Sequence, residues 1–193
     1  MKKTSLKKIG SEKKTVWVTR PNLNEDHLLK KRRESAYKSI SKVFDEKKDF
    51  ETVMQMAENF GNTIFKEFVK EKPQKWTMKN WVEPVVKNVF NPMGAAATFT
   101  KITDDEARSL IFRCPAPEHF DTSGMPSCLF SYGFTRGLLL SAFPEGELVM
   151  DKTMSDGFPM CEFVFKAKAS DSDKKEKERI KKHFVKYESK MIK

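Results

Sequence analysis

Apolar residues recur every three to four positions through the first half of the chain, which is the spacing of one face of an α-helix. The pattern is most regular after Asp49, which can cap the start of a helix. An earlier helix can begin at Asn24, and the pair Asn80 and Glu83 resembles the capping box of a later one. Pro84 would kink this last helix unless it lies in the first turn. The predicted helices cover residues 24–44, 50–68 and 80–90.

The second half of the chain contains paired β-favouring runs. A polar stretch separates the members of the first pair, and Asp156 with Gly157 separates those of the second. Asp and Gly tolerate the positive φ of a tight turn, so both pairs read as hairpins. The predicted hairpin strands are residues 98–102 with 108–114, and 147–154 with 160–167.

The remaining segments complete an α+β fold. Residues 128–143 are apolar enough for a buried helix despite Gly133 and Gly137, and residues 117–124 suit a short helical turn. The order is helices, hairpin, helix, hairpin and helix, so a small antiparallel sheet of two hairpins must be covered by helices. We expect a basic flexible arm over residues 1–22, with a short strand or docking segment at Val16 to Val18. A single domain over residues 23–169 and a basic C-terminal helix over residues 170–193 complete the predicted organisation.

Charge changes the picture of the two ends. The net charge is +10, yet residues 1–48 hold 15 Lys or Arg against 6 acids, and residues 166–193 hold 11 against 5. Residues 49–165 hold 11 against 16 and are net negative. This distribution favours basic tails or solvated helix faces over a nucleic-acid groove. We therefore expect no nucleic-acid binding beyond nonspecific attraction to the basic ends, which salt would weaken.

Composition and missing motifs narrow the class further. Three cysteines form no disulfide framework, no secretory signal precedes the first helix and no stretch could cross a membrane, so we expect a cytoplasmic protein without a membrane partner. The chain has no phosphate loop, Rossmann fingerprint, nucleophile elbow, CxxC pair or HExxH motif. We expect no cofactor and no metal, and the sequence does not indicate an oligomeric state.

The cysteines carry the candidate chemistry. Cys114 ends the first hairpin, Cys128 begins the apolar helix and Cys161 lies in the last strand. If the hairpins share a sheet, these thiols and His119 can converge, and an imidazole activates a thiol as a nucleophile. Inert packing is the alternative for each thiol, and a surface position is the alternative for His119. A Cys₃His zinc site is a third reading, although the spacing matches no compact zinc module.

Two charged residues near these thiols each have two possible interpretations. Arg136 lies within the apolar helix, where its guanidinium needs either an anionic partner, such as a ligand carboxylate, or a face open to water. Glu162 alternates to the strand face opposite Cys161, where it is solvated or beside the cysteine.

Residues 108–166 resemble the L-2-amino-thiazoline-4-carboxylic acid hydrolase family. The matching positions are Cys114, Gly124, Pro126, Cys128, Thr153, Gly157, Cys161 and Phe163. Glu162 stands where that family has Asp, and Ser131 stands near the position of an expected acid. The resemblance implies an α+β fold similar to the 4-vinyl-reductase-type ligand-binding domains.

The resemblance implies two functions. The first is a hydrolase that opens a small sulfur heterocycle at its C=N carbon. Cys161, Cys114 and His119 would be its catalytic residues, and Cys128, Arg136 and Ser131 would bind the substrate. The alternative is a noncatalytic domain that binds a small apolar or tetrapyrrole-like ligand and signals to a partner. A polyanion-binding protein that works through the basic ends is a third hypothesis.

Overall fold

Two long helices begin at aspartate caps. The computed structural model describes residues 17–18, 25–114, 127–169, 178–179 and 182. In α1 (His27–Lys47), the carboxylate of Asp26 accepts a hydrogen bond from the Leu29 N–H, so the cap lies two residues after the predicted Asn24. In α2 (Phe50–Phe68), Asp49 accepts from Glu51 N and Thr52 N, as its position predicts.

The third helix changes its hydrogen-bond register after a proline. In α3 (Met78–Val85), Thr77 and Asn80 form the capping box, so the predicted pairing of Asn80 with Glu83 is wrong by one helical turn. Pro84 lies inside α3 rather than in its first turn, and the chain continues as the π-helix η1 (Val86–Phe90). Proline supplies no N–H to the ladder, which is one cause of such local changes in register.

One antiparallel sheet contains both predicted hairpins. The first hairpin is β2 (Ala96–Ile102) with β3 (Glu106–Arg113), and the second is β4 (Glu147–Lys152) with β5 (Cys161–Lys166). The strand order is β1-β2-β3-β5-β4, in which β1 (Trp17–Val18) adds to the edge at β2. Strands β3 and β5 join the hairpins, and Ile111 pairs with Cys161. The α+β prediction is confirmed.

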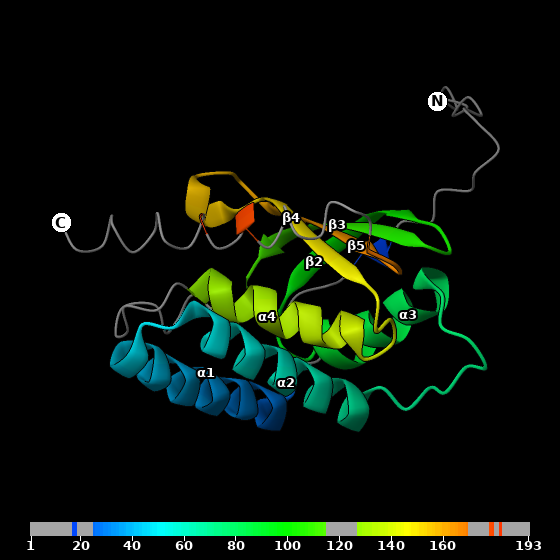
Figure 1. Cartoon of the computed structure of the whole chain (residues 1–193). Helices are drawn as coiled ribbons and strands as arrows, with labels where there is room; N and C mark the ends of the chain where they lie inside the picture. Colours follow the sequence, from blue (N-terminus) through cyan, green and yellow to red (C-terminus); the bar gives the residue numbers. More distant parts are fainter. Residues whose placement is uncertain (1–16, 19–24, 115–126, 170–177, 180–181, 183–193) are drawn as a thin grey trace, which may run out of the picture.

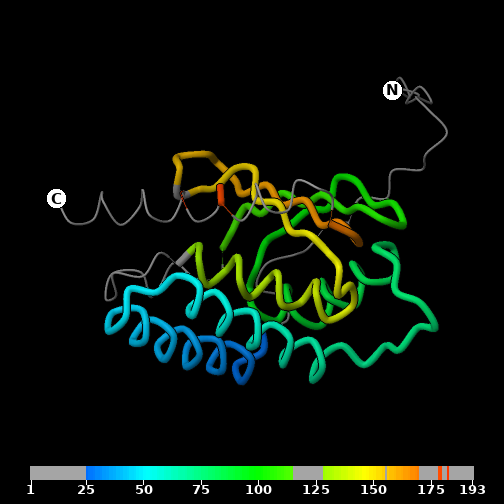
Figure 2. Tube along the Cα trace, in the orientation of Figure 1, coloured from blue at the N-terminus to red at the C-terminus, as the bar shows by residue number. Residues whose placement is uncertain are grey.

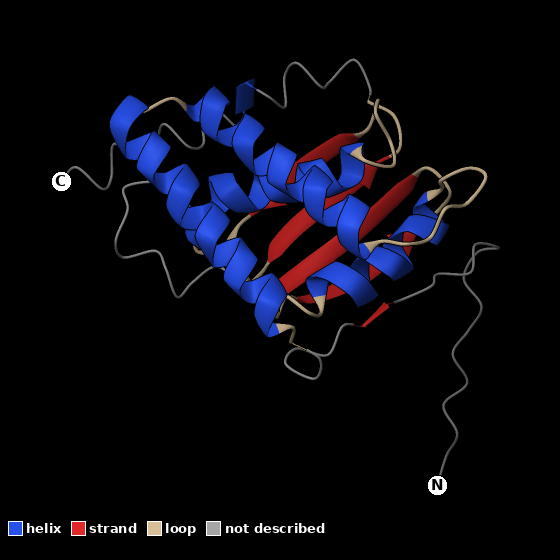
Figure 3. Ribbon diagram, turned by 90° about the horizontal axis from the view of Figure 1, so that it is seen from below, coloured by secondary structure: helices blue, strands red, loops and turns tan. Residues whose placement is uncertain are grey.

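Helices α1, α2, α3 and α4 cover one face of this sheet (Figure 3). Small residues on the inner face of β3, Ala107 and Ser109, lie between larger apolar residues on the neighbouring strands. Phe99 of β2 and Phe165 of β5 approach with ring centroids 5.9 Å apart. Trp81 of α3 lies on Phe165 at 5.3 Å. The core is therefore an aromatic layer between the sheet and the helices.

A final helix, α4 (Ser127–Leu140), lies between the sheet and the α1–α2 pair (Figures 1 and 2). Its glycines permit backbone contact with α2. A Cβ on Gly137 would lie 2.1 Å from the Glu58 carbonyl oxygen, and one on Gly61 of α2 would lie 2.1 Å from the Phe134 carbonyl oxygen. Gly133 and Gly137 have low intrinsic helix propensity, yet their lack of a side chain lets α4 pack closely against α2.

The basic ends lie mostly outside the described residues. Within the C-terminal segment, residues 178, 179 and 182 are helical, and the Arg179 guanidinium donates a hydrogen bond to the Met150 carbonyl of β4. The predicted helical turn at residues 117–124 also lies outside the described residues. No helix among the described residues has the length and apolar character that crossing a membrane requires.

Candidate functional site

Cys114 and Ser131 are in contact at one end of the sheet, and Cys161 lies near them. Cys114 follows the last residue of β3, and its Sγ lies 3.7 Å from the Oγ of Ser131 in α4. Cys161 begins β5 opposite Ile111, three residues before Cys114. An electrostatic interaction with Cys114 also raises the pKa of Cys161. We call Cys114, Ser131 and Cys161 the thiol cluster.

The Cys161 thiol is held in its neutral form. Its side chain is buried, and its Sγ accepts a hydrogen bond of 3.3 Å from the Met154 N–H. Burial raises the pKa of Cys161, the Met154 hydrogen bond partly opposes this, and the charges of Cys114 and Asp156 raise the pKa further. The thiolate, which is the nucleophilic form, is therefore disfavoured.

The turn between β4 and β5 fixes that hydrogen bond. The hydroxyl of Thr153 accepts from the Asp156 N–H at 3.2 Å and donates to the Asp156 carboxylate at 2.7 Å, which closes the 3₁₀ turn η3 (Met154–Asp156). Gly157 follows at φ +89°, where residues other than glycine are strained. Thr153 and Gly157 thus serve the backbone, and they present Met154 N to the sulfur.

Of the remaining predicted site residues, Cys128 and Arg136 lie on α4, and His119 lies outside the described residues. Cys128 is the second residue of α4 and is half-buried against the core. Arg136 forms a part-buried ion pair with Glu58 of α2, so a carboxylate of this chain already contacts its guanidinium. The role of His119 as a base stays a prediction, as do the substrate-binding roles of Cys128 and Arg136.

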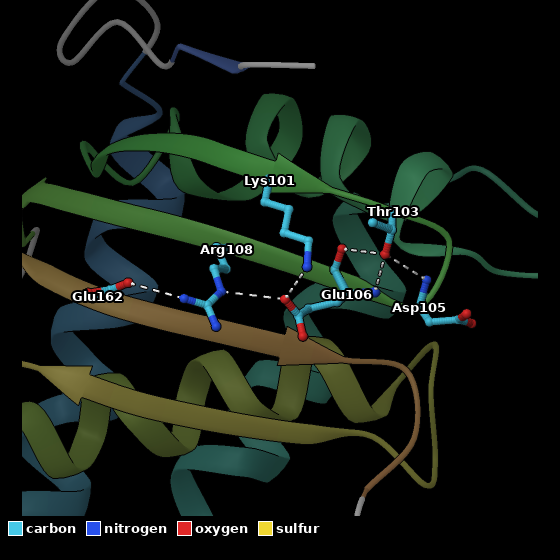
Figure 4. A network of polar contacts seen from close by, with 6 residues as sticks. All are labelled: Lys101, Thr103, Asp105, Glu106, Arg108 and Glu162. Atoms are coloured by element: carbon cyan, nitrogen blue, oxygen red, sulfur yellow. Dashed lines mark hydrogen bonds and ion pairs between the residues drawn. The ribbon is translucent and has the colours of Figure 1, made fainter. Parts of the chain in front are cut away.

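Glu162 faces away from the thiol cluster, as the strand alternation predicts. Figure 4 shows it on the outer face of the sheet, near Arg108 at 3.8 Å. Lys152 is 3.3 Å away on the other side. Arg108 also contacts Glu106, which in turn binds Lys101 at 3.1 Å. This carboxylate therefore belongs to a surface charge network.

Contacts between distant segments could not be read from local sequence patterns. Glu58 is 78 positions from Arg136, and no short motif links them. The hydrogen bond from the Met154 backbone N–H to the Cys161 sulfur could not be predicted from the pattern of side chains either. Among the residues that the structure describes, no group of three or more His, Cys, Asp or Glu could hold a metal ion.

Comparison with known proteins finds solved structures that resemble this chain. No protein-family model and no curated protein matches the sequence. The crystal structure of a trafficking protein particle complex subunit 3 from Naegleria fowleri, covalently bound to palmitic acid, is similar at a TM-score of 0.49 and 15% identity. The match covers 72% of this chain and 94% of that chain. A likeness of this degree carries no argument about what this chain binds.

Proposed function

We propose that this chain is a noncatalytic binding domain for a small, largely apolar ligand, with the thiol cluster as part of the site. The observation that carries the proposal is the neutral, buried Cys161 thiol. A catalytic cysteine requires ready access to the thiolate, whereas burial, Cys114 and Asp156 all raise this pKa. Neutral thiols are polarisable and weakly polar, which suits contact with apolar ligand atoms.

Sequence and packing support the same proposal. Residues 108–166 also resemble the 4-vinyl-reductase-type ligand-binding domains. The aromatic layer of the core extends along the inner face of the sheet, and Cys161 and Phe163 lie on that face. An apolar ligand at the thiol cluster would therefore lie beside an existing hydrophobic surface.

A direct test is native mass spectrometry of the purified chain, followed by identification of any small molecule that is released. We expect a bound apolar compound, and its readdition should raise the melting temperature of the stripped protein. Cys161→Phe, which fills the site, should abolish that increase, whereas Arg108→Gln on the outer face of the sheet should retain it. A stripped protein that gains no stability from any apolar compound would contradict the proposal.

A second candidate function is hydrolysis of a small sulfur heterocycle, as the family resemblance implies. One observation favours it, because Cys114 and Ser131 approach each other at 3.7 Å beside Cys161. The test is ring opening of L-2-amino-thiazoline-4-carboxylate by the wild type, Cys161→Ser and Cys114→Ser. Turnover that falls in both variants would support catalysis, while undiminished turnover in Cys161→Ser would remove this thiol as the nucleophile.

A further inference from the structure

Four charged side chains gather where α1 begins and β3 ends. Glu25 precedes α1 and forms an ion pair with Lys30. Arg113 is the last residue of β3, and its Nη1 lies 3.8 Å from the Glu25 carboxylate. Arg33 is 4% exposed and donates a hydrogen bond of 3.0 Å to the Met93 carbonyl. We call Glu25, Lys30, Arg33 and Arg113 the cationic cluster.

A glycine turn lets the carboxylate of this cluster approach the backbone. Gly94 has φ +81°, and a Cβ on it would lie 2.7 Å from the Glu25 Oε1. The Asp26 N–H donates to the Pro92 carbonyl at 3.0 Å and ties the start of α1 to the same turn. The position of Glu25 is therefore set by the fold and not by its own side-chain rotamers alone.

Positive charge predominates in the cationic cluster, which carries three cations and one carboxylate. The Lys30 hydrogen bond lowers the pKa of Glu25 and desolvation opposes it, while the charges of Lys30, Arg113 and Arg33 lower the pKa further. Arg33 contributes its charge from a buried position, where solvent screens it less. An anionic group that enters this region is attracted by the same cations that hold Glu25 ionised.

Arg113 is the member that a ligand can reach. Its side chain is 39% exposed, and that of Lys30 is 25% exposed. A guanidinium presents a planar fork of donors that matches a carboxylate or a phosphate. The 3.8 Å separation from Glu25 is an ion-pair contact longer than a hydrogen bond. Arg113 also directly precedes Cys114 of the thiol cluster.

We propose that Arg113 and Lys30 form a subsite for the anionic group, a carboxylate or a phosphate, of an otherwise apolar ligand. This inference rests on the proposed binding function, because the thiol cluster would contact the apolar part of the same ligand. Glu25 occupies the subsite in the ligand-free chain and competes with the incoming anion. The ligand class is thus an amphiphile with one acidic head.

The anion subsite can be tested without knowing the ligand. Inorganic phosphate and acetate would be titrated into the full chain at low ionic strength, and binding followed by backbone amide shifts near residue 113. We expect saturable shifts in the wild type and about tenfold weaker binding in Arg113→Gln, because a charge-assisted hydrogen bond is lost. Glu25→Gln should bind several-fold more tightly, because the competing carboxylate is removed. Arg113→Lys, which keeps the charge but not the fork, should lie between wild type and Arg113→Gln.

Arg108→Gln is the matched control. Arg108 lies on β3 as well, but on its outer face, where it pairs with Glu106 and Glu162. The control should bind phosphate as the wild type does. Equal binding by the wild type and Arg113→Gln, or no saturable shift in the wild type, would overturn the inference.

A second titration distinguishes failure of the subsite from failure of the proposed function. Dodecyl phosphate should bind more tightly than inorganic phosphate, and Cys161→Phe should remove this gain without affecting inorganic phosphate. If both anions bind equally and both are lost in Arg113→Gln, the anion subsite stands and the apolar site at the thiol cluster is wrong. Tighter binding of dodecyl phosphate that Arg113→Gln leaves unchanged would overturn the subsite and retain the proposed function.

Discussion

At the residue scale, Cys161 illustrates how a single backbone donor modifies a buried thiol. Burial disfavours the thiolate, whereas the Met154 N–H at 3.3 Å stabilises negative charge on sulfur. Burial is the larger effect, so the pKa is raised overall. The result is a cysteine with a defined orientation and low reactivity.

This balance predicts slow alkylation of Cys161. Iodoacetamide should modify it more slowly than Cys114 or Cys128 by roughly an order of magnitude or more at neutral pH, since burial limits both thiolate and access. The measurement is peptide mass spectrometry at several times and pH values. The Cys161 rate should still be rising above the ordinary thiol pKa, because its own pKa is raised. Faster modification of Cys161 than of Cys114 would contradict the neutral-thiol interpretation.

The raised pKa of Cys161 also predicts how the stability of the fold changes with pH. A folded-state pKa above the unfolded value means that the folded chain retains its proton more strongly. The associated stability is present below the ordinary thiol pKa and is lost as the pH rises through the raised value. Urea unfolding of wild type and Cys161→Ser across alkaline pH should show a steeper loss in the wild type.

Arg136 and Glu58 form a pair whose partners depend on each other. Their side chains are 15% and 12% exposed, so either charge alone would be left partly buried. Arg136→Met and Glu58→Gln should each destabilise the fold by about 1–3 kcal/mol, and the double variant should lose less than the sum. Chemical denaturation of the four proteins measures this coupling. Additive losses would show that the pair contributes no mutual stabilisation.

At the element scale, α2 and α4 are in contact through their backbones. Gly61 and Gly137 each face a carbonyl of the opposite helix, and Gly133 faces the Cβ of Ala57 and the carbonyl of Met54. Small residues four positions apart recur on one face of each helix, so the two helices fit along a shared line. Any larger side chain on this line must displace a backbone.

Gly137→Ala should therefore destabilise the chain. Alanine favours an unconstrained helix over glycine by about 1 kcal/mol, but its Cβ would lie 2.1 Å from the Glu58 carbonyl oxygen. We expect a net loss of about 2 kcal/mol, typical of overpacking that the surroundings cannot relieve. Asn59→Ala, on the exposed face of α2, is the control and should change stability little. A thermal melt that shows Gly137→Ala to be more stable than the wild type would refute the close contact.

Element types follow from local sequence, while their partners do not. Periodicity and the Asp49 cap predict α2, and the alternation around Asp156 and Gly157 predicts the second hairpin. We expected Cys114 and Cys161 to lie near each other if the two hairpins share a sheet. The hairpins do share one sheet. The Glu58 partner of Arg136 and the closeness of α4 to α2 depend on helix packing, which no local pattern encodes. His119 remains a predicted base that lies outside the described residues.

At the scale of the whole molecule, charge is divided between the ends and the middle. Residues 49–165 are net negative, although the chain is net positive by 10. The cationic cluster concentrates positive charge within the fold, because the start of α1 and the end of β3 bring cations together. Sequence segments alone would not have shown this concentration, since Arg113 lies within the net negative stretch.

The basic ends predict salt-sensitive, nonspecific attraction to polyanions. Heparin binding should weaken steeply as salt rises, because it depends on counterion release. Removal of residues 1–15 and 183–193 leaves β1 and the described part of the C-terminal segment in place. Fluorescence anisotropy should show that this truncated chain loses most of the affinity. Undiminished affinity would place the polyanion contacts on the folded part instead.

The contact between α2 and α4 also provides a fixed reference for measuring motion. Because backbone atoms set their separation, rotamer changes cannot alter it, and the two helices should move as a unit. A spectroscopic label on exposed Asn59 of α2 would therefore report the position of Ser131 in α4 as well. Paired with a second label on Lys101 of the sheet, it would measure the distance across the layer between the helices and the sheet.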